Sequence, residues 1–259
     1  MNVQEIMNRD IIYVDKDVDL KYVIKLMKKH NITKIPVVEN HKPIGLVTDS
    51  NIAKKLGAIR TRGVPSARLH ASSVLDKDIE IISPLTKISD ILPSVGEPGP
   101  TMLLVGTKED LVGVVTKADL LPLVEDTTPL EEVMKQVVHS VSPEDRVIHA
   151  RRQMIDADIA RLPVVNNGVL IGIISDIDVV YAIDKIKKGF PIGKQKHQLD
   201  ELLVHDVMSS PAVSIQSNKT VSDAAEMMIK HHVGCLPVMQ NEKIAGIISR
   251  TDILKTIKL

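Results

Sequence analysis

The chain has 259 residues, of which 44% are apolar and 2% aromatic, and its 33 basic and 33 acidic residues give a formal net charge of zero. This length supplies enough apolar side chains for two domains of ordinary size. The neutral charge argues against a general polyanion binder, and the scarcity of aromatic residues removes the base-stacking platforms used by single-strand nucleic-acid binders.

The cysteine content and the apolar runs indicate the compartment. The single cysteine, Cys235, excludes a disulfide framework and is typical of a reducing environment. No apolar run approaches the roughly 18 residues expected of a membrane span, and the first residues lack the basic and apolar regions of a signal peptide. We therefore expect a cytoplasmic protein with no membrane partner.

A short pattern occurs four times along the chain: a glycine, two apolar residues, a Ser or Thr, two variable residues, and an Asp or Asn. The four copies run from Gly45 to Asn51, from Gly113 to Asp119, from Gly172 to Asp178 and from Gly246 to Asp252. A pattern with fixed internal spacing that recurs over the whole length indicates four copies of one structural unit.

In the first copy this signature follows a predicted strand, helix and hairpin. Residues 11–14 are expected to form the strand, and Asp17 to cap the helix. Apolar residues recur along this helix at the spacing of one face, and lysines fill the other face. Two apolar runs around a polar turn then predict a β-hairpin, whose first strand is opened by Pro36. Residues 51–56 predict a second helix.

The second copy departs from this order. Its predicted helix, residues 87–95, is interrupted by Pro93, and no proline opens the strand at residues 102–105. We expect this unit to be degenerate and the weakest for any function that the copies share.

The third and fourth copies repeat the order of the first. Strands are expected at residues 137–141 and 212–215, and helix caps near Ser142 and Ser217. Each copy is thus a strand, a helix, two strands and a helix. The sequence predicts an α/β (α+β) fold of four β-α-β-β-α units.

The signature has a chemical interpretation that needs only its residue types. A strand that ends in Gly-x-x-Thr/Ser lets a ligand approach closely at the glycine and brings a hydroxyl to the N-cap of the next helix. The N-terminus of that helix favours phosphate, and an acid one turn further on can accept hydrogen bonds from two sugar hydroxyls. The alternative is that these acids only cap helices at the surface.

The order of these features resembles the CBS domain, a regulatory repeat named after cystathionine β-synthase. The resemblance covers residues 1–57, 71–125, 130–187 and 202–259. Its marks are the Asp-Val-Met run at residues 206–208, shorter forms of it at Ile6-Met7 and Val133-Met134, the strand with an apolar residue, Pro and Val, and the signature itself. A single chain of four such repeats resembles the archaeal relatives of the AMP-activated protein kinase γ subunit.

The resemblance implies a fold and a set of site residues. Repeats of this family pair into two modules with back-to-back sheets and two clefts each, and the modules form a flat pseudo-symmetric disk. The residues implied to contact adenosine and its ribose are Thr48, Asn51, Thr116, Asp119, Ser175, Asp178, Ser249 and Asp252. Those implied to form the strand beside adenine are Ile35, Pro36, Leu162, Pro163, Leu236 and Pro237.

Basic residues near the signatures are implied to bind phosphate. They are Lys34, Arg161 and Arg250, with Lys117 as a further candidate, whereas Asp49 and Asp176 at the corresponding places would repel phosphate. In the first copy Asn51 stands where the family has the ribose acid, so this site should be weaker or differently selective. The third and fourth copies both keep the proline strand, the Ser and the Asp, and Arg161 adds a basic residue, so we expect them to form the best ligand module.

These observations favour a non-catalytic sensor that binds AMP, ADP or ATP and signals to an unknown protein partner by rearrangement of its modules. The alternatives are a ligand-independent scaffold, a sensor of S-adenosylmethionine or a similar compound, and a nucleic-acid-binding regulator that uses the basic connectors at residues 60–70 and 185–197. A homodimer could form by module stacking. No nucleophile motif is present, and His231 and His232 point in different directions on a helix, so neither an enzyme nor a metal site is expected.

Overall fold

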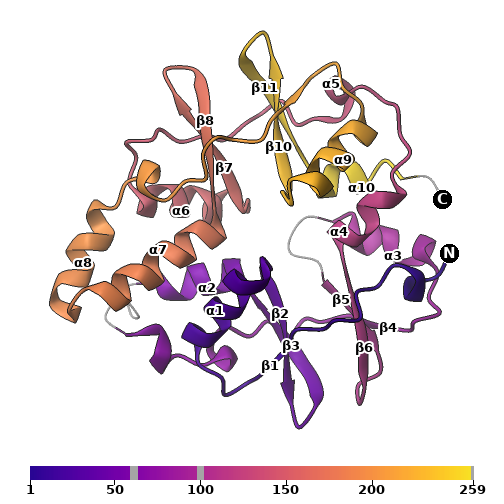
Figure 1. Cartoon of the computed structure of the whole chain (residues 1–259), viewed down its shortest axis with the longest axis horizontal. Coiled ribbons are helices and arrows are strands. Elements are labelled where there is room, and N and C mark those ends of the chain that lie inside the picture. The colour runs from indigo at the N-terminus through magenta and orange to yellow at the C-terminus, as the bar shows by residue number, and fades with distance from the viewer. Residues whose placement is uncertain (59–63, 98–101, 258–259) are drawn as a thin grey trace.

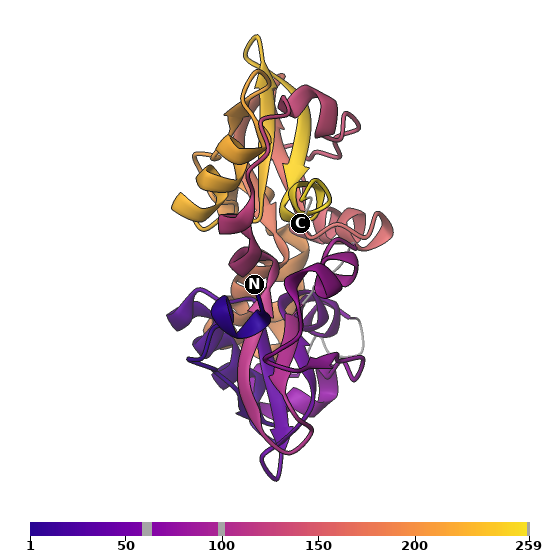
Figure 2. The ribbon, with the colours of Figure 1, turned by 90° about the vertical axis from the view of Figure 1, so that its right-hand side faces the viewer.

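The computed structural model describes residues 1–58, 64–97 and 102–257, so Arg60 and Arg62 of the first basic connector lie outside the described residues. Four similar units surround a common centre, with the hairpins of the first two at one edge and those of the last two at the opposite edge (Figure 1). The edge-on view shows that the molecule is flat (Figure 2). This is the mixed α/β disk of paired repeats that the sequence predicts.

Each unit contains a hairpin with a helix on either side of it in the chain. The first unit comprises β1 (Val14–Asp15), α1 (Leu20–His30), β2 (Lys34–Glu39), β3 (Lys42–Thr48) and α2 (Asp49–Leu56). The second comprises β4 (Ile81–Ile82), α3 (Ile88–Val95), β5 (Met102–Gly106), β6 (Leu111–Thr116) and α4 (Lys117–Leu120).

The third unit has two further helices, and the fourth keeps the plan of the first two. The third comprises α5 (Leu130–Val133), α6 (Val147–Asp156), β7 (Arg161–Asn166), β8 (Val169–Ser175) and α7 (Asp176–Gly189), and α8 (Ile192–Glu201) follows it. The fourth comprises β9 (Ile215–Gln216), α9 (Val221–Lys230), β10 (Cys235–Gln240), β11 (Lys243–Ser249) and α10 (Arg250–Leu254). Within the described residues, none of the helices has both the length and the apolar character needed to span a membrane.

The first strand of a unit is short, and in the first, third and fourth units it is shorter than predicted. It pairs in parallel with the hairpin over two residues in three units, and in the third unit it is a single bridge between Val141 and Val164. We expected the prolines to open their strands, but each proline is the third residue of its strand. Pro36 pairs with Leu46 on the hairpin side, whereas β1 pairs only with Val37 and Val38, so no neighbour requires the missing N–H of Pro36.

Several predicted helix limits were also wrong. The caps lie two or three residues later than expected, at Asp19 and Thr220, and Arg146 precedes α6. Pro93 lies inside α3 and does not interrupt it. The helix loses one hydrogen bond there, but Ile88, Ile91 and Val95 remain buried, and this burial supports the turn.

Within each pair of repeats, the last strand of one hairpin bonds to the segment that leads into the other repeat. Leu46 and Asp76 exchange two backbone hydrogen bonds of 2.8 Å, and Asn8 and Val114 exchange two of 2.9 Å. The same exchange joins Ile173 to Ser209 and Lys135 to Ile247. The first two repeats therefore form one module, and the last two form the other.

These backbone contacts between paired repeats explain why each signature contains a glycine. A Cβ atom at Gly45 would lie 2.3 Å from the carbonyl oxygen of Asp76, and one at Gly246 would lie 2.8 Å from that of Lys135. The close approach that we assigned to a ligand is made instead by the backbone of the paired repeat. The glycine is required for pairing, and its presence does not itself indicate a ligand.

The two main cores run across the boundary between the modules. One combines the helices α1 and α2 of the first repeat with α6 and α7 of the third, and the other combines the second and fourth repeats. A small cluster of Leu46, Leu104 and Val114 lies between the sheets of the first module. Because each module supplies half of both cores, neither is a complete folding unit by itself.

Candidate functional site

The four signature hydroxyls all stand at helix N-termini. Thr48, Thr116, Ser175 and Ser249 end the hairpins β3, β6, β8 and β11 and are the N-cap residues of α2, α4, α7 and α10. The strand carries the hydroxyl to the place where the helix leaves its first N–H groups unpaired. Each repeat thus presents the same polar end, as the sequence predicts.

In three repeats the signature acid folds back on this hydroxyl. Asp119 Oδ2 accepts hydrogen bonds from Thr116 N at 2.7 Å and from its Oγ1 at 2.8 Å. Asp252 Oδ2 accepts from Ser249 N at 2.9 Å and from its Oγ at 2.6 Å. Asp178 binds Ser175 in the same way. These acids therefore do cap their helices, and we expect their removal to lower the stability of the ligand-free protein by about 1 kcal/mol.

The capping bonds occupy only one oxygen of each acid. Oδ1 of Asp252 faces Lys135 Nζ at 3.3 Å, an exposed partner. Burial raises the pKa of Asp178, and hydrogen bonds from Ser175 and Ser209 partly oppose that shift. A carboxylate with one oxygen fixed by the cap keeps acceptor capacity on its second oxygen, which a ribose hydroxyl could use.

The first repeat lacks this arrangement. Thr48 Oγ1 accepts from Asn51 N at 3.1 Å, which caps α2 in the ordinary direction. The side-chain amide of Asn51 donates instead to the carbonyl of Val74 at 3.3 Å. This asparagine is engaged with the segment that leads into the second repeat, a contact that its sequence position did not indicate.

Three cations from different repeats lie near the centre of the disk. Burial lowers the pKa of Lys34 to about 8; Asp49 opposes the shift, whereas the charges of Lys117, Arg161 and Arg250 add to it. Burial, followed by the charge of Arg161, lowers the pKa of Arg250, so these two guanidinium groups also repel each other. The three predicted phosphate-binding residues are thus brought within electrostatic range of one another.

Neither arginine forms an ion pair within the described part of the chain, although Asp49, Asp176 and Asp178 lie within electrostatic range of Arg161, and Asp119 within that of Arg250. No ion pair joins Arg161 or Arg250 to a described carboxylate, and Arg250 Nε is buried without a hydrogen-bond partner. Arg161 lies over Gly234, where a Cβ atom would meet its guanidinium at 3.0 Å. The fourth repeat has no basic residue at this place, and the gap is filled by the arginine of the third. Unpaired buried cations are costly unless an anion binds them.

Lys117 has a different use from the one we considered. Its Nζ donates to the carbonyl of Glu97 and to Thr251 Oγ1, both at 2.6 Å, and links the second repeat to the fourth. It is buried, and burial lowers its pKa to about 8. Two of its protons are therefore committed to the protein, which leaves it a poor phosphate ligand.

The position that Lys117 occupies, directly after the N-cap hydroxyl, holds a buried acid in the first and third repeats. Asp49 and Asp176 are 8% and 4% exposed. Burial and then the charge of Asp49 raise the pKa of Asp176 to about 6, and burial raises that of Asp49. Between the first and third repeats the seam is acidic, so an anion is disfavoured there.

The predicted adenine strand lies beside the cores. The side chains of Ile35 and Leu162 belong to the first core and that of Leu236 to the second, and all three are fully buried. Pro36, Pro163 and Pro237 alternate with them along the strand and project to its other face. Among the described residues, no three His, Cys, Asp or Glu side chains gather as a metal site.

Comparison with known proteins places these features in a family. The sequence profile of the CBS domain matches residues 3–58, 130–185 and 204–259. The second repeat, which we expected to be degenerate, lies outside these matches.

Relatives of similar layout occur in the archaeon Methanocaldococcus jannaschii. Protein MJ1404 is 23% identical over 98% of this chain, which spans 61% of that protein. MJ1225 is 21% identical over 96% of this chain and 95% of its own length. A crystal structure of MJ1225, described as a proposed archaeal homologue of γ-AMPK, superposes with a TM-score of 0.85 and covers 98% of this chain and 99% of that one.

A region similar in sequence to this chain also occurs in an enzyme. Inosine-5'-monophosphate dehydrogenase from the same organism is 29% identical over 73% of this chain, but the match covers only 37% of the enzyme.

Proposed function

Because the chain belongs to the CBS domain family, we propose that it is a non-catalytic regulatory protein that binds adenine nucleotides in clefts between paired repeats. The four repeats at residues 1–57, 71–125, 130–187 and 202–259 would each contribute one polar helix end to a cleft. The ligand would be AMP, ADP or ATP, and a protein partner would respond to the resulting arrangement of the modules.

The observation that carries this proposal is the pair of arginines at the centre. Arg161 and Arg250 are partly buried and repel each other, and no described carboxylate pairs with them. Such an arrangement costs stability unless a multiply charged anion lies between the guanidinium groups. Phosphate satisfies this requirement through charge and through bidentate hydrogen bonds.

The nucleoside would be held by the neighbouring signatures. Ser175 with Asp178 and Ser249 with Asp252 stand at the two helix ends of the second module, and Asp119 of the first module faces the charge of Arg250. One oxygen of each acid is fixed by the capping bonds, which leaves the other to accept from the ribose hydroxyls. The third and fourth repeats therefore remain the best candidates for the tighter sites.

A signal would arise by a population shift. The cores join repeats of different modules, and Lys117 bridges the second and fourth repeats directly. A phosphate chain at the centre would contact residues of several repeats and would favour the arrangement in which they converge. The partner would read that arrangement, and stacking of two disks into a homodimer is a further prediction.

Calorimetry of the full chain with adenosine, AMP, ADP and ATP tests the proposal. We expect affinity to rise from adenosine to the phosphorylated ligands, because only these reach the arginines. Asp178→Asn keeps an oxygen for the cap but removes the charge, and it should weaken the binding of every one of these ligands by about 1.5–3 kcal/mol at one site. Failure of all four ligands to bind, with an unoccupied protein confirmed by mass spectrometry, would contradict the proposal.

The same titrations separate the alternatives. S-Adenosylmethionine should bind no better than adenosine, since its tail offers no phosphate to Arg161 and Arg250. If it bound more tightly than ATP, a sensor of that compound would be supported instead.

A second candidate is a ligand-independent scaffold. It is favoured by the capping boxes, which satisfy Asp119, Asp178 and Asp252 without any ligand. A scaffold predicts that Asp178→Ala lowers the melting temperature while no nucleotide binds.

A further inference from the structure

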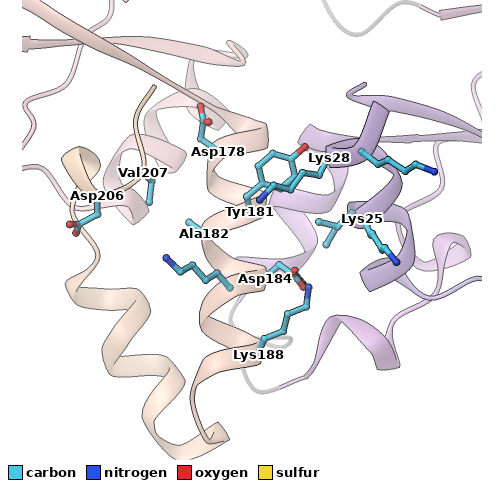
Figure 3. Close-up of a pocket in the computed structure, with 12 residues that line it drawn as sticks. Lys25, Lys28, Asp178, Tyr181, Ala182, Asp184, Lys188, Asp206 and Val207 are labelled. Carbon is cyan, nitrogen blue, oxygen red and sulfur yellow. Dashed lines mark hydrogen bonds and ion pairs between the residues drawn. The ribbon is translucent and has the colours of Figure 1, made fainter. Parts of the chain in front are cut away.

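A groove of about 610 Å³ lies over the seam between the first and third repeats, between α1, α7 and the segment that contains Asp206 and Val207 (Figure 3). Five lysines line it, namely Lys25, Lys28, Lys29, Lys185 and Lys188. The groove reaches Asp178 at one end, but the lysines belong to neither the signatures nor the central arginine pair.

The lysines of α1 are a departure from the repeat. Met27, Met154 and Met228 are buried at equivalent points of the three helices that precede hairpins β2, β7 and β10. When the helices are matched on these methionines, Lys25, Lys28 and Lys29 correspond to Arg152, Ile155 and Asp156 in α6 and to Glu226, Ile229 and Lys230 in α9. The fold therefore does not require the three lysines.

The other wall of the groove is also a departure. Helix α7 has 14 residues, whereas its counterparts α2, α4 and α10 have 8, 4 and 5. Its additional turns carry Lys185 and Lys188, and Figure 3 shows Lys188 on the side of α7 that faces α1. Two features that each occur in one repeat alone thus meet at one place.

Buried polar contacts hold the extended part of α7 in position. Ser66 Oγ donates to Asp184 Oδ1 at 2.7 Å, and Lys187 Nζ donates to the carbonyl of Val64 at 2.7 Å. Ser66, Asp184 and Lys187 are all buried. The segment between the first two repeats therefore clamps α7 of the third, and the groove has a fixed wall.

The groove carries more positive than negative charge, because five lysines and three aspartates line it. Asp184 pairs with Lys188 and Ser66, so one of the lining carboxylates is already used. Among the described residues Lys25, Lys29 and Lys185 have no ion pair, and Lys28 lies 5.5 Å from the centre of the Tyr181 ring. All five lysines are exposed. Their mutual repulsion has no structural benefit, and this points to a role in binding.

We propose that this groove, which we call the lysine groove, binds an acidic segment of a partner protein. Lys25 and Lys29 are one helical turn apart, about 6 Å, and Lys185 and Lys188 line the same groove from α7, so carboxylates of one peptide can meet lysines of both helices. Asp178 and Asp206 at the margins limit an acidic ligand to a short segment between them, and the zero net charge of the chain argues against a long nucleic acid. Charge complementarity of this kind gives specificity and fast association.

The position of the groove gives such a segment a regulatory consequence. Helix α1 belongs to the first module and α7 to the second, so a bound segment contacts both. The segment would bind most tightly to the arrangement in which the lysines of α1 and α7 lie close together, and it would stabilise that arrangement. This consequence rests on the proposed function, but binding of the segment does not.

Fluorescence anisotropy of a labelled hexaglutamate peptide with the full chain, in low salt and without nucleotide, tests the proposal. We expect binding that weakens as salt is added, and a loss of about tenfold or more in affinity for the double variant Lys25→Glu, Lys28→Glu. Lys185→Glu should weaken binding independently from the other wall. The matched control, Lys230→Glu with Lys243→Glu, makes the same charge change on exposed lysines of the fourth repeat and should bind as the wild type does.

Three results would overturn the proposal: no binding of the peptide at low salt, equal binding by the groove and control variants, or displacement of the peptide by duplex DNA or tripolyphosphate at concentrations below those of unlabelled hexaglutamate. Circular dichroism of each variant checks that it is folded. Because nucleotide is absent, failure here is distinct from failure of nucleotide binding.

Discussion

The seam between the first and third repeats and the seam between the second and fourth have the same fold and opposite charge. The residue directly after the N-cap hydroxyl is Asp49 or Asp176 at the first seam and Lys117 or Arg250 at the second. Burial shifts each seam toward neutrality, since it raises the pKa of Asp176 to about 6 and lowers that of Lys117 to about 8. The fold accepts either an acid or a base at this position, so the residue found there determines the charge of the seam.

The two seams also use their buried charges differently. Lys117 donates to Thr251 and to the carbonyl of Glu97 and so joins two repeats. At the acidic seam the junction is made by Arg151, which donates from Nε to the carbonyl of Ala53 and from a terminal nitrogen to that of Lys54, both at 3.1 Å. The first seam is therefore held by Arg151 as well as by the hydrogen bond between Asp176 and the Ser50 side chain, and anions should gather at the second seam.

The largest expected effect comes from the seam between the second and fourth repeats, which we call the cationic seam; the seam between the first and third repeats is the acidic seam. Arg250→Ala should lower the affinity for ATP by about 2–3 kcal/mol, roughly thirty- to 150-fold, because a charge-assisted hydrogen bond to phosphate is lost. Adenosine affinity should change little. Arg152→Ala, an exposed arginine of α6, is the matched control. Equal losses for adenosine and ATP would show that Arg250 supports the cleft and does not contact phosphate.

A smaller effect is expected at the acidic seam. The pKa of Asp176 is raised to about 6 in the folded protein from 3.8, so its contribution to stability is present below pH 4 and is lost as pH rises through 6. Asp176→Asn should therefore raise the free energy of unfolding by about 2 kcal/mol at pH 7 and by much less at pH 4.

Urea denaturation at several pH values measures this difference, with the exposed Asp10→Asn as control. A loss of stability at pH 7 would mean that the charged form of Asp176 is stabilised by partners that outweigh its burial.

The cationic seam should respond to pH in the opposite direction. The pKa of Lys117 falls to about 8 from 10.5, so its contribution is present above pH 10.5 and is lost as pH falls through 8. Between pH 7 and pH 9 the wild type should gain about 1 kcal/mol from this group, and Lys117→Met should not.

The exposed Lys108→Met serves as control in the same urea titrations. If Lys117→Met kept the pH dependence of the wild type, another group would be responsible for it.

The smallest effect concerns the first repeat. Asn51→Asp should strengthen adenosine binding there by about 1 kcal/mol, since a charged acceptor forms stronger hydrogen bonds than a neutral one. The gain is limited by the lost bond to the carbonyl of Val74. It should be smaller for ATP than for adenosine, because Asp49 already makes this seam acidic.

Calorimetry with adenosine, AMP and ATP measures the comparison, and the exposed Asn218→Asp is the control. Unchanged affinity for all three ligands would show that the first repeat contributes no cleft.

Local patterns in the sequence were sufficient for the plan of the repeat. The alternation of apolar residues around a polar turn predicts each hairpin, and the hydroxyl that ends it marks the start of the next helix. Both signals lie within a few residues of the structure they predict. The predicted limits of the helices were less accurate. Asp19 caps α1 where we expected Asp17, because a cap depends on backbone angles that several nearby polar residues could adopt.

The tertiary structure decided the contacts between residues far apart in the chain. Ser66 and Asp184 are separated by 118 positions, and Lys117 and Thr251 by 134, so no local pattern links them. The reason for each signature glycine is of the same kind, since the atoms that exclude a side chain at Gly45 belong to another repeat. Repeats with the same local pattern can pair in more than one way, and only packing across the seams selects which cores form and which buried charges meet.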